Sequence, residues 1–422
     1  MFDRAAAWIS GISLLAIVFS AGLGFAYFNL PPYSLFQWAV GQVKSLSDEP
    51  SRLMRARYDY AGTRIHDRAA VAPGTTFITS HFPEFGWHGG ARLIDIDGNV
   101  LHRWGADPKE IFDTRVKYPY MHGSYLYPNG DILANYSFIG LAKISACGDV
   151  LWTHSDLRPH HSVSVAADGT IWVSGNRKLD SRDGRDEKIA SALAYPVHED
   201  LFVQLSPDGE VLRSISSIEA LDRSGLQEVV MRMIKRRDGD IFHLNDVEPL
   251  SPEMADEYPL FNAGDILVSM RDIHMVAVLD PETYQVKWHT TSDTLFQHDP
   301  DFIGDGWIGI FDNNFDRTET GKILGGTRIK AVRPHTGERK VLFPTDASPD
   351  FYTKWSGKWQ QLPNGNMLLT EARAGHALEV DQTGKPVWEW TIEKYDDTQV
   401  PEVMEATRYP YTAEDVAAWK CP

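Results

Sequence analysis

One unit of turn and strand recurs along most of this chain, and the repetition limits the folds open to it. A turn led by Gly, or once by Tyr, is followed by a short strand six times, at residues 98–104, 148–152, 209–212, 284–288, 337–341 and 384–388. An alternating strand such as 92–96 precedes each copy. Short strands in a unit of about 50 residues are typical of a β-propeller. The sequence therefore predicts an all-β fold.

The second copy can be divided into all of its strands, which are 124–127, 131–136, 141–145 and 149–153. Four antiparallel strands in each of six units predict a six-bladed β-propeller over residues 71–411. The first unit lacks an obvious first strand, and residues 403–409 could supply it and close the ring. Helices are predicted at 217–238 and in the tail 412–422, where Thr412 begins a capping box.

The N-terminal stretch 5–28 carries no charge. As a helix it would span about 36 Å, enough to cross the apolar core of a bilayer. We therefore predict a transmembrane anchor within 1–30, followed by a juxtamembrane neck at 31–70 with helical spacing through Arg57. Arg4 precedes the stretch and Lys44 is the next basic residue, which favours an N-terminus inside the cell. The expected location is the cell membrane, single-pass, with the propeller on the periplasmic side; a cleaved signal peptide is the competing interpretation.

The net charge of −17 argues against a nucleic-acid partner, which requires a basic surface. A small anionic substrate stays possible, because a basic pocket can lie inside an acidic shell. The two cysteines, Cys147 and Cys421, could form one bridge in an oxidising compartment or stay as two thiols.

Three histidines share one position in the repeat. His122, His161 and His298 each lie eight residues before the glycine of a turn, at Gly130, Gly169 and Gly306. That position is the start of the first strand of a blade, which lines the central channel of a propeller. His243 also precedes an apolar run, at 247–250. We expect four histidines from four blades to converge on one mouth of the channel.

The antiparallel return of the second strand adds polar groups to this mouth. It brings Arg271 next to His243, 312–314 near His298, and 176–177 near His161. Asn245 follows His243 by two residues and therefore shares its strand face. Histidines alone would suit a transition metal. A guanidinium among them disfavours a dication and suits a tetrahedral oxyanion, with one imidazole as nucleophile. The residues alone do not distinguish sulfuryl from phosphoryl transfer.

The chain resembles the bacterial arylsulfotransferase family, which moves sulfate between aryl esters and phenols without a nucleotide donor. The segments that carry the resemblance run in order along the propeller: 90–104, His160-His161, His243-Leu-Asn245, Ser269-Met-Arg271, Gln297-His298, Phe311-Asp-Asn313 and 362–366. The resemblance implies an aryl sulfate donor, a phenolic acceptor, no metal and no other cofactor.

The resemblance also implies roles for single residues. His298 would be transiently sulfated, while His243, Asn245 and Arg271 hold the sulfuryl oxygens. His161, rather than His160, would polarise the sulfate or the leaving oxygen. Asn313 is expected to contact substrate.

Two features depart from the family, and a third residue lacks an explanation. The well-known members have a separate N-terminal β-domain, for which this chain has no room, so dimerisation through it is in doubt. His122 is an additional histidine, for which a structural role is expected. Asp299 could orient the imidazole of His298 or cap a turn.

Two other functions fit the same residues. One is a four-histidine metal-dependent propeller enzyme, which predicts stoichiometric metal in the purified protein. The other is a non-catalytic propeller subunit of a membrane assembly, which predicts no turnover of a chromogenic aryl sulfate. Aromatic residues near the mouth could stack on an aryl ring or belong to the propeller core: Tyr120, Phe242, Phe296 and Phe311.

Overall fold

The computed structural model describes residues 17–22, 50, 52–105, 107–182, 184–234, 239–292 and 294–419. The chain divides into two compact units, 1–51 and 52–422. In the first unit, residues 17–22 are helical. No helix within the described ranges is long and apolar enough to cross a membrane. The remainder of the predicted anchor, the neck residues 31–49 and Cys421 lie outside these ranges.

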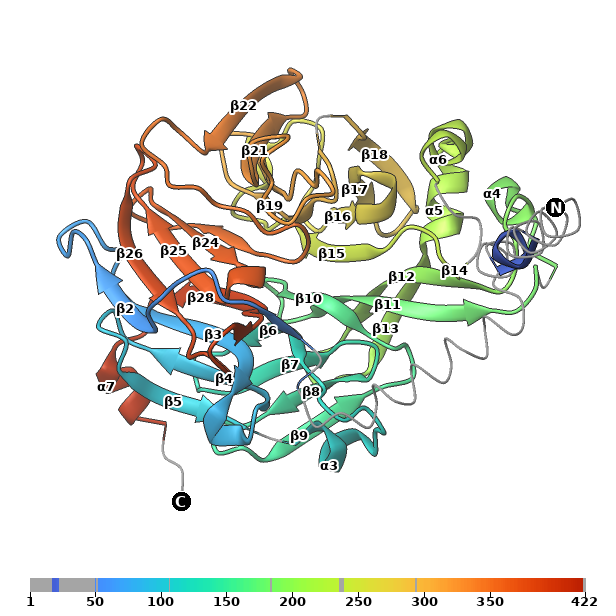
Figure 1. Ribbon diagram of the computed structural model, residues 1–422. Coiled ribbons are helices and arrows are strands. Elements are labelled where there is room, and N and C mark those ends of the chain that lie inside the picture. Colours follow the sequence, from blue (N-terminus) through green and yellow to red (C-terminus); the bar gives the residue numbers. More distant parts are fainter. Residues whose placement is uncertain are drawn as a thin grey trace, which may run out of the picture. The chain divides into compact units, whose positions relative to one another are not determined.

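The second unit is a ring of blades, each a four-stranded antiparallel sheet or an extension of one (Figure 1). The first blade has the order β28 (Glu405–Tyr409), β3 (Thr75–Phe82), β4 (His88–Ile94), β5 (Val100–Trp104). The second contains β6 (Met121–Leu126), β7 (Ile132–Tyr136), β8 (Gly140–Ile144) and β9 (Val150–His154). The third contains β10 (His160–Val165), β11 (Ile171–Leu179), β12 (Val197–Leu205) and β13 (Val211–Ser216), with β14 (Gly239–Asp240) parallel to β12.

The fourth blade contains β15 (Leu244–Pro249), β16 (Ile266–Met270), β17 (Met275–Asp280) and β18 (Gln285–Thr290). The fifth contains β19 (His298–Phe302), β20 (Ile308–Asp312), β21 (Arg328–Arg333) and β22 (Glu338–Phe343). The sixth has the order β23 (Trp359–Gln361), β24 (Met367–Glu371), β25 (His376–Val380), β26 (Pro386–Thr391), β2 (Gly62–Ile65). The predicted six-bladed, all-β propeller is thus confirmed.

Both ends of the second unit tie the ring together. The C-terminal strand β28 pairs antiparallel with β3, from Glu405 opposite Thr79 to Tyr409 opposite Thr75 (Figure 1). This is the closure that the sequence predicted. The described part of the neck also contributes strands: β1 (Leu53–Arg55) pairs with β27 (Gln399–Pro401), and β2 extends the sixth blade. The helical spacing expected through Arg57 is therefore wrong for this segment, because its backbone hydrogen bonds go to strand edges.

Helices are short and lie between or outside the blades: α3 (Pro108–Phe112), α4 (Lys188–Ser191), α5 (Ser217–Arg223), α6 (Gln227–Met233) and α7 (Ala413–Ala417), with 3-10 turns η1 (Pro83–Phe85), η2 (Ala255–Glu257), η3 (Arg271–Ile273) and η4 (Ala372–Ala374). The α5–α6 pair confirms the predicted helical insertion. The Ser216 side chain accepts a hydrogen bond from Glu219 N and so caps α5. The capping box of Thr412 and Asp415 begins α7.

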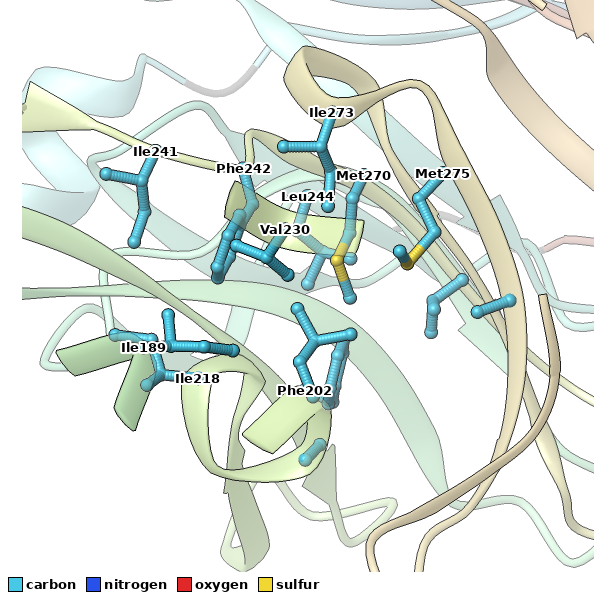
Figure 2. Close-up of a cluster of buried hydrophobic side chains, with 14 of the residues drawn as sticks. Ile189, Phe202, Ile218, Val230, Ile241, Phe242, Leu244, Met270, Ile273 and Met275 are labelled. Atoms are coloured by element: carbon cyan, nitrogen blue, oxygen red, sulfur yellow. The ribbon is translucent and has the colours of Figure 1, made fainter. Parts of the chain in front are cut away.

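Apolar packing between neighbouring blades keeps the first strands in place. Figure 2 shows one such cluster, in which Ile218 of α5 and Val230 of α6 pack with Phe202 of β12 and Met270 of β16. All four side chains are fully buried. Strand β24 is buried throughout, whereas the outer strand β22 is largely exposed. Strands near the axis are thus covered on both faces, which fixes the channel-lining residues.

Candidate functional site

The start of the first strand in each blade lines one small cavity on the propeller axis. Its volume is about 30 Å³, room for about two water molecules. Every blade contributes to its lining, including in turn Glu405, His122, His161, Asn245, His298 and Gly357. Gly357, like the three histidines, lies eight residues before a turn glycine, Gly365. The shared spacing found in the sequence therefore corresponds to a shared place in the channel.

The fourth blade differs from the sequence expectation. Asn245, and not His243, lines the cavity there, because Asn245 is the unpaired residue of a β-bulge between Leu244 and Asp246. Similar bulges follow Met121, His160 and His298. A bulge turns a side chain away from the regular pleat and is frequent beside active sites.

Backbone strain accompanies these bulges. His161, His243, Phe296 and Asp299 have φ values of 59°, 55°, 60° and 45°. Such conformations cost on the order of 1–3 kcal/mol for residues other than glycine and are frequent at functional sites.

His298 is held in one tautomer by its neighbours. Its Nδ1 lies 2.6 Å from Asn313 Oδ1 and 3.0 Å from Phe296 O. Both partners are oxygens that accept, so Nδ1 carries the proton and Nε2 keeps its lone pair. Burial, followed by the charge of Arg271, lowers the pKa of His298 to about 3. The imidazole is therefore neutral, with an unprotonated Nε2, at physiological pH.

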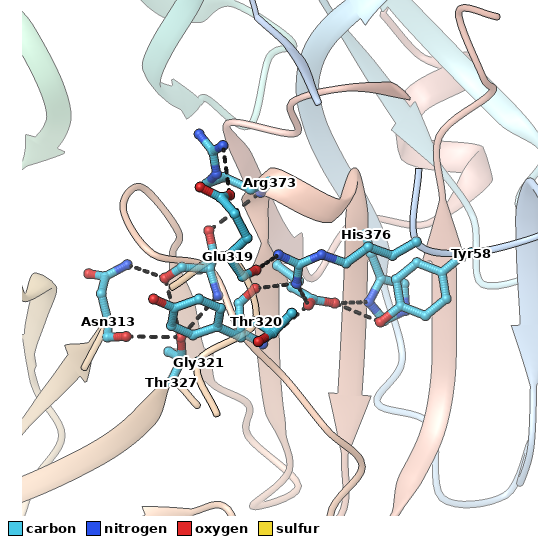
Figure 3. A network of polar contacts seen from close by, with 12 residues as sticks. Tyr58, Asn313, Glu319, Thr320, Gly321, Thr327, Arg373 and His376 are labelled. Carbon is cyan, nitrogen blue, oxygen red and sulfur yellow. Dashed lines mark hydrogen bonds and ion pairs between the residues drawn. The ribbon is translucent and has the colours of Figure 1, made fainter. Parts of the chain in front are cut away.

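Asn313 owes its own orientation to two carbonyl groups. Its Nδ2 donates to Thr353 O at 2.9 Å and to Ser356 O at 2.7 Å, which directs Oδ1 to His298. Its backbone carbonyl accepts from Thr327 Oγ1 at 3.4 Å (Figure 3). Asn313 is fully buried. Its side chain therefore contacts His298 and not the cavity.

This network continues outward to the segment before β2. Glu371 accepts from Arg57 at 2.8 Å and from Tyr58 at 2.6 Å, and its Oε2 lies 3.3 Å from His376 Nδ1 (Figure 3). The described part of the neck thus supports the blade next to His298.

Histidines from two blades form a chain of short contacts. His243 Nδ1 lies 2.5 Å from Asp240 Oδ2, and His243 Nε2 lies 3.3 Å from His161 Nε2. His161 Nδ1 lies 2.7 Å from Nδ1 of its neighbour His160. His122, His161 and His298 line the cavity as predicted, with the rings of His161 and His298 6.3 Å apart, whereas His243 lies behind His161 and does not line it.

Arg271 lies where the strand geometry predicted, whereas Asn245 does not share a strand face with His243. Arg271 N donates to His243 O at 3.1 Å, so the end of β16 lies beside His243. Its Nε donates to Asp272 Oδ1, while its terminal nitrogens have no hydrogen-bond partner in the described part of the chain. Asn245 Nδ2 donates to Gln297 O at 2.9 Å, which leaves one amide proton for another acceptor.

Several expected neighbours serve other purposes. Asn176 contacts His198 and Arg177 contacts Glu199, so neither reaches His161. Asp299 accepts from Trp359 N at 2.7 Å and does not contact the imidazole of His298.

His122 joins the channel histidines, with its ring 4.0 Å from that of His161. Of the aromatic residues considered, Phe242 and Phe311 are fully buried core residues. Phe296 lies under the Arg271 guanidinium at 5.6 Å, and Tyr120 binds Arg52.

Sequence reasoning missed the two carboxylates behind the histidines. Asp240 precedes His243 by three residues, and Asp200 lies 3.7 Å from His160 Nε2 across the blade. No periodic pattern marks either residue, since their contacts depend on β12 and β14. Among the described residues, no three His, Cys, Asp or Glu side chains converge as a metal site.

The solved structures to which this chain is similar share little sequence with it. A protein of unknown function from Bacteroides caccae is 13% identical, with a TM-score of 0.49, covering 78% of this chain and 99% of that one. TolB from Acinetobacter baumannii is 11% identical, with a TM-score of 0.43, covering 78% and 65%. The WD40 β-propeller domain of Doa1 is 11% identical, with a TM-score of 0.41, covering 81% and 87%.

A comparison with protein families gives a direct assignment. The model described as Arylsulfotransferase (ASST) matches residues 126–393, more than half of the chain. No curated protein sequence matches the chain significantly. The matched region begins in the second blade and contains His160, His161, Asp200, Asp240, His243, Asn245, Arg271, His298 and Asn313, but not Glu405 or His122.

Proposed function

Because the chain belongs to the arylsulfotransferase family, we propose that it moves a sulfuryl group from an aryl sulfate ester to a phenolic acceptor through a sulfohistidine on His298. Family membership itself indicates a transferase with arylsulfotransferase activity. The finer statements, namely the covalent intermediate, the donor and the acceptor, are the proposal.

The observation that carries the proposal is the fixed tautomer of His298. Asn313 Oδ1 and Phe296 O hold the proton on Nδ1, and the low pKa keeps Nε2 unprotonated. A neutral imidazole with a directed lone pair is an activated nucleophile without further deprotonation.

The transfer proceeds in two balanced steps. The Nε2 lone pair of His298 attacks sulfur, and the bond from sulfur to the aryl oxygen breaks with its electron pair on oxygen. A phenolic oxygen then attacks the same sulfur, and the N–S pair returns to His298. The terminal nitrogens of Arg271 and the free amide proton of Asn245 stabilise charge on the sulfuryl oxygens, with His243 beside them.

Asn313 has a different role in this proposal from the one expected of it. It positions His298 and does not bind substrate, because its amide is fully buried and engaged with three protein groups.

We also propose that residues 1–30 anchor the protein in the cell membrane, with residues 71–411 as a periplasmic catalytic domain. The uncharged stretch 5–28 supports an anchor. The full-length protein should stay with membranes in alkaline carbonate, and release into the supernatant would contradict the anchor.

Covalent labelling tests the intermediate. An aryl sulfate radiolabelled in sulfur should leave acid-labile label on the wild type and none on His298→Asn. His335→Asn is the matched control, because His335 is exposed on the outer edge of the same blade and should label normally. Equal labelling of His298→Asn and the wild type would refute the covalent step.

A further inference from the structure

A buried carboxyl group, Asp200, lies at the inner end of the histidine chain. It is fully buried, and neither of its carboxylate oxygens makes a hydrogen bond to another described residue. His160 Nε2, 3.7 Å away, also lacks a hydrogen bond. Burial disfavours the ionised carboxylate, and the backbone N–H of Leu244 and the charge of His243 offset this only in part, so the protonated form of Asp200 is favoured. Burial, followed by the charge of Asp240, raises the pKa of Asp200 well above its ordinary range.

The outer end of the chain is a carboxylate with the opposite behaviour. Burial acts against the charge of Asp240, but the hydrogen bond from His243 and the nearby charges of His243, His160 and Arg271 together outweigh burial and hold the pKa of Asp240 below its ordinary value. The Asp240 side chain is 37% exposed. Two carboxyl groups at the ends of one chain of imidazoles therefore differ in protonation.

One order of donors keeps every imidazole of the chain neutral while Asp240 is ionised. His243 Nδ1 donates to Asp240, so its Nε2 accepts from His161 Nε2. His161 Nδ1 then accepts from His160 Nδ1, and His160 Nε2 is left as an acceptor facing the acid of Asp200. Neutral imidazoles agree with burial, which lowers the pKa of His160 to about 4 and that of His161 well below its usual value.

We propose that His160 and Asp200 form a proton reservoir behind His161, which supplies a proton to the leaving aryl oxygen and recovers one from the acceptor phenol. This inference rests on the proposed sulfuryl transfer. His161 is the group that meets the substrate oxygen, whereas His160 and Asp200 act through it as positioning residues. The ring of Phe138 stacks on His160 at 4.6 Å and holds it away from the cavity.

The proton movements balance over the cycle. In the first step, His161 Nε2 gives up its hydrogen bond to His243 Nε2 and transfers that proton to the aryl oxide. His160 Nδ1 then gives its proton to His161 Nδ1, and Asp200 gives its proton to His160 Nε2. The phenol leaves neutral, and Asp200 becomes a carboxylate. In the second step, the acceptor phenol returns a proton to His161 Nε2 and each transfer reverses. The gap of 3.7 Å closes through a small rotation of the Asp200 side chain.

The reservoir should matter most when the leaving phenolate is a strong base. In Asp200→Asn, the amide can still donate to His160 Nε2 but has no proton to release. We expect rates of phenol release from 4-nitrophenyl sulfate, which needs little protonation, to stay within about threefold of wild type. Release from unsubstituted phenyl sulfate should fall about 100-fold, the lower range of general acid catalysis.

A structural role for Asp200 would lower both rates by the same factor, and that outcome would overturn the proposal. A selective loss in Asp240→Asn but not in Asp200→Asn would also overturn it, because the proton would then enter from the exposed end. Should Asp200→Asn fail to fold, the wild type provides the test. The rate with phenyl sulfate in mixtures of light and heavy water should curve, since several protons move together; a straight line would reject the relay.

Labelling separates this inference from the proposed function. Label on His298 in the wild type and in Asp200→Asn, together with the selective loss of rate with phenyl sulfate, supports the proposed function and the reservoir. If His298 is labelled in both proteins but Asp200→Asn slows release from both aryl sulfates by the same factor, the reservoir alone is refuted. No label on the wild type refutes both.

Discussion

Replacing Asn313 by alanine tests how far the site depends on the tautomer of His298. The change removes the 2.6 Å acceptor of Nδ1, while Phe296 O at 3.0 Å stays. As His298 becomes sulfurylated, its ring gains positive charge and the Nδ1 bond becomes charge-assisted. Such a bond contributes about 1.5–3 kcal/mol, which predicts a loss of about 10- to 150-fold in kcat.

The structure also predicts which kinetic parameter changes. Asn313 is fully buried and contacts no part of the cavity, so KM for the aryl sulfate should stay within about twofold. The measurement is steady-state release of 4-nitrophenol with saturating phenol as acceptor. Removal of the donor to Ser356 O should lower the free energy of unfolding by about 1–3 kcal/mol in urea, because a buried carbonyl loses its partner.

Thr327→Val is the matched control. Thr327 Oγ1 contacts Asn313 O and Thr353 O in the same network but does not touch His298 (Figure 3). It should lower stability and change kcat less than threefold. An Asn313→Ala enzyme with wild-type kcat, or one whose entire defect lies in KM, would refute the tautomer argument.

Two further predictions concern charge. Arg271→Lys keeps the charge but loses the planar fork that grips two oxygens, so kcat/KM should fall about 10- to 100-fold; an unchanged value would show that Arg271 acts only through its charge. Burial opposes protonation of His376, but hydrogen bonds with Glu371 and Glu389 outweigh it and raise the pKa of His376, while the pKa of Glu389 is lowered to about 2. The stabilisation from this network should therefore be full between about pH 4.5 and 6.5, decline as pH rises through the raised pKa of His376, and decline as pH falls toward 2. Urea unfolding across this range should show the alkaline decline in wild type and not in His376→Asn; identical slopes would contradict the assignment.

The number of blades and the identity of three channel histidines were determined by the sequence alone. Both depend on short-range spacing, because a strand, a tight turn and its returning strand keep a fixed count of residues. The eight-residue distance from each turn glycine to His122, His161 and His298 is therefore also a position in space. The pairing of Arg271 with His243 followed from the same antiparallel rule.

The eight-residue spacing did not apply where an insertion lengthens the repeat. In the fourth blade, the long connection between Pro249 and Ile266 prevents an eight-residue count back from the turn glycine. The sequence therefore assigned His243 to the channel position that Asn245 occupies in the structure. A β-bulge cannot be recognised from the alternation of apolar residues, since one unpaired residue changes neither the number of apolar residues in the strand nor its composition detectably.

The sequence placed 312–314 near His298, but the tertiary structure decided which atoms bind the histidines. Asn313 selects the tautomer of His298, Asp240 binds His243, and Asp200 lies behind His160. Asp200 reaches His160 across the strands of one blade, Asp240 lies three residues before His243, and Asn313 follows the strand that returns beside His298. The sequence thus determines which imidazoles reach the channel, whereas the packed fold determines where each proton resides, because hydrogen-bond partners and burial are properties of the surroundings and not of the residue.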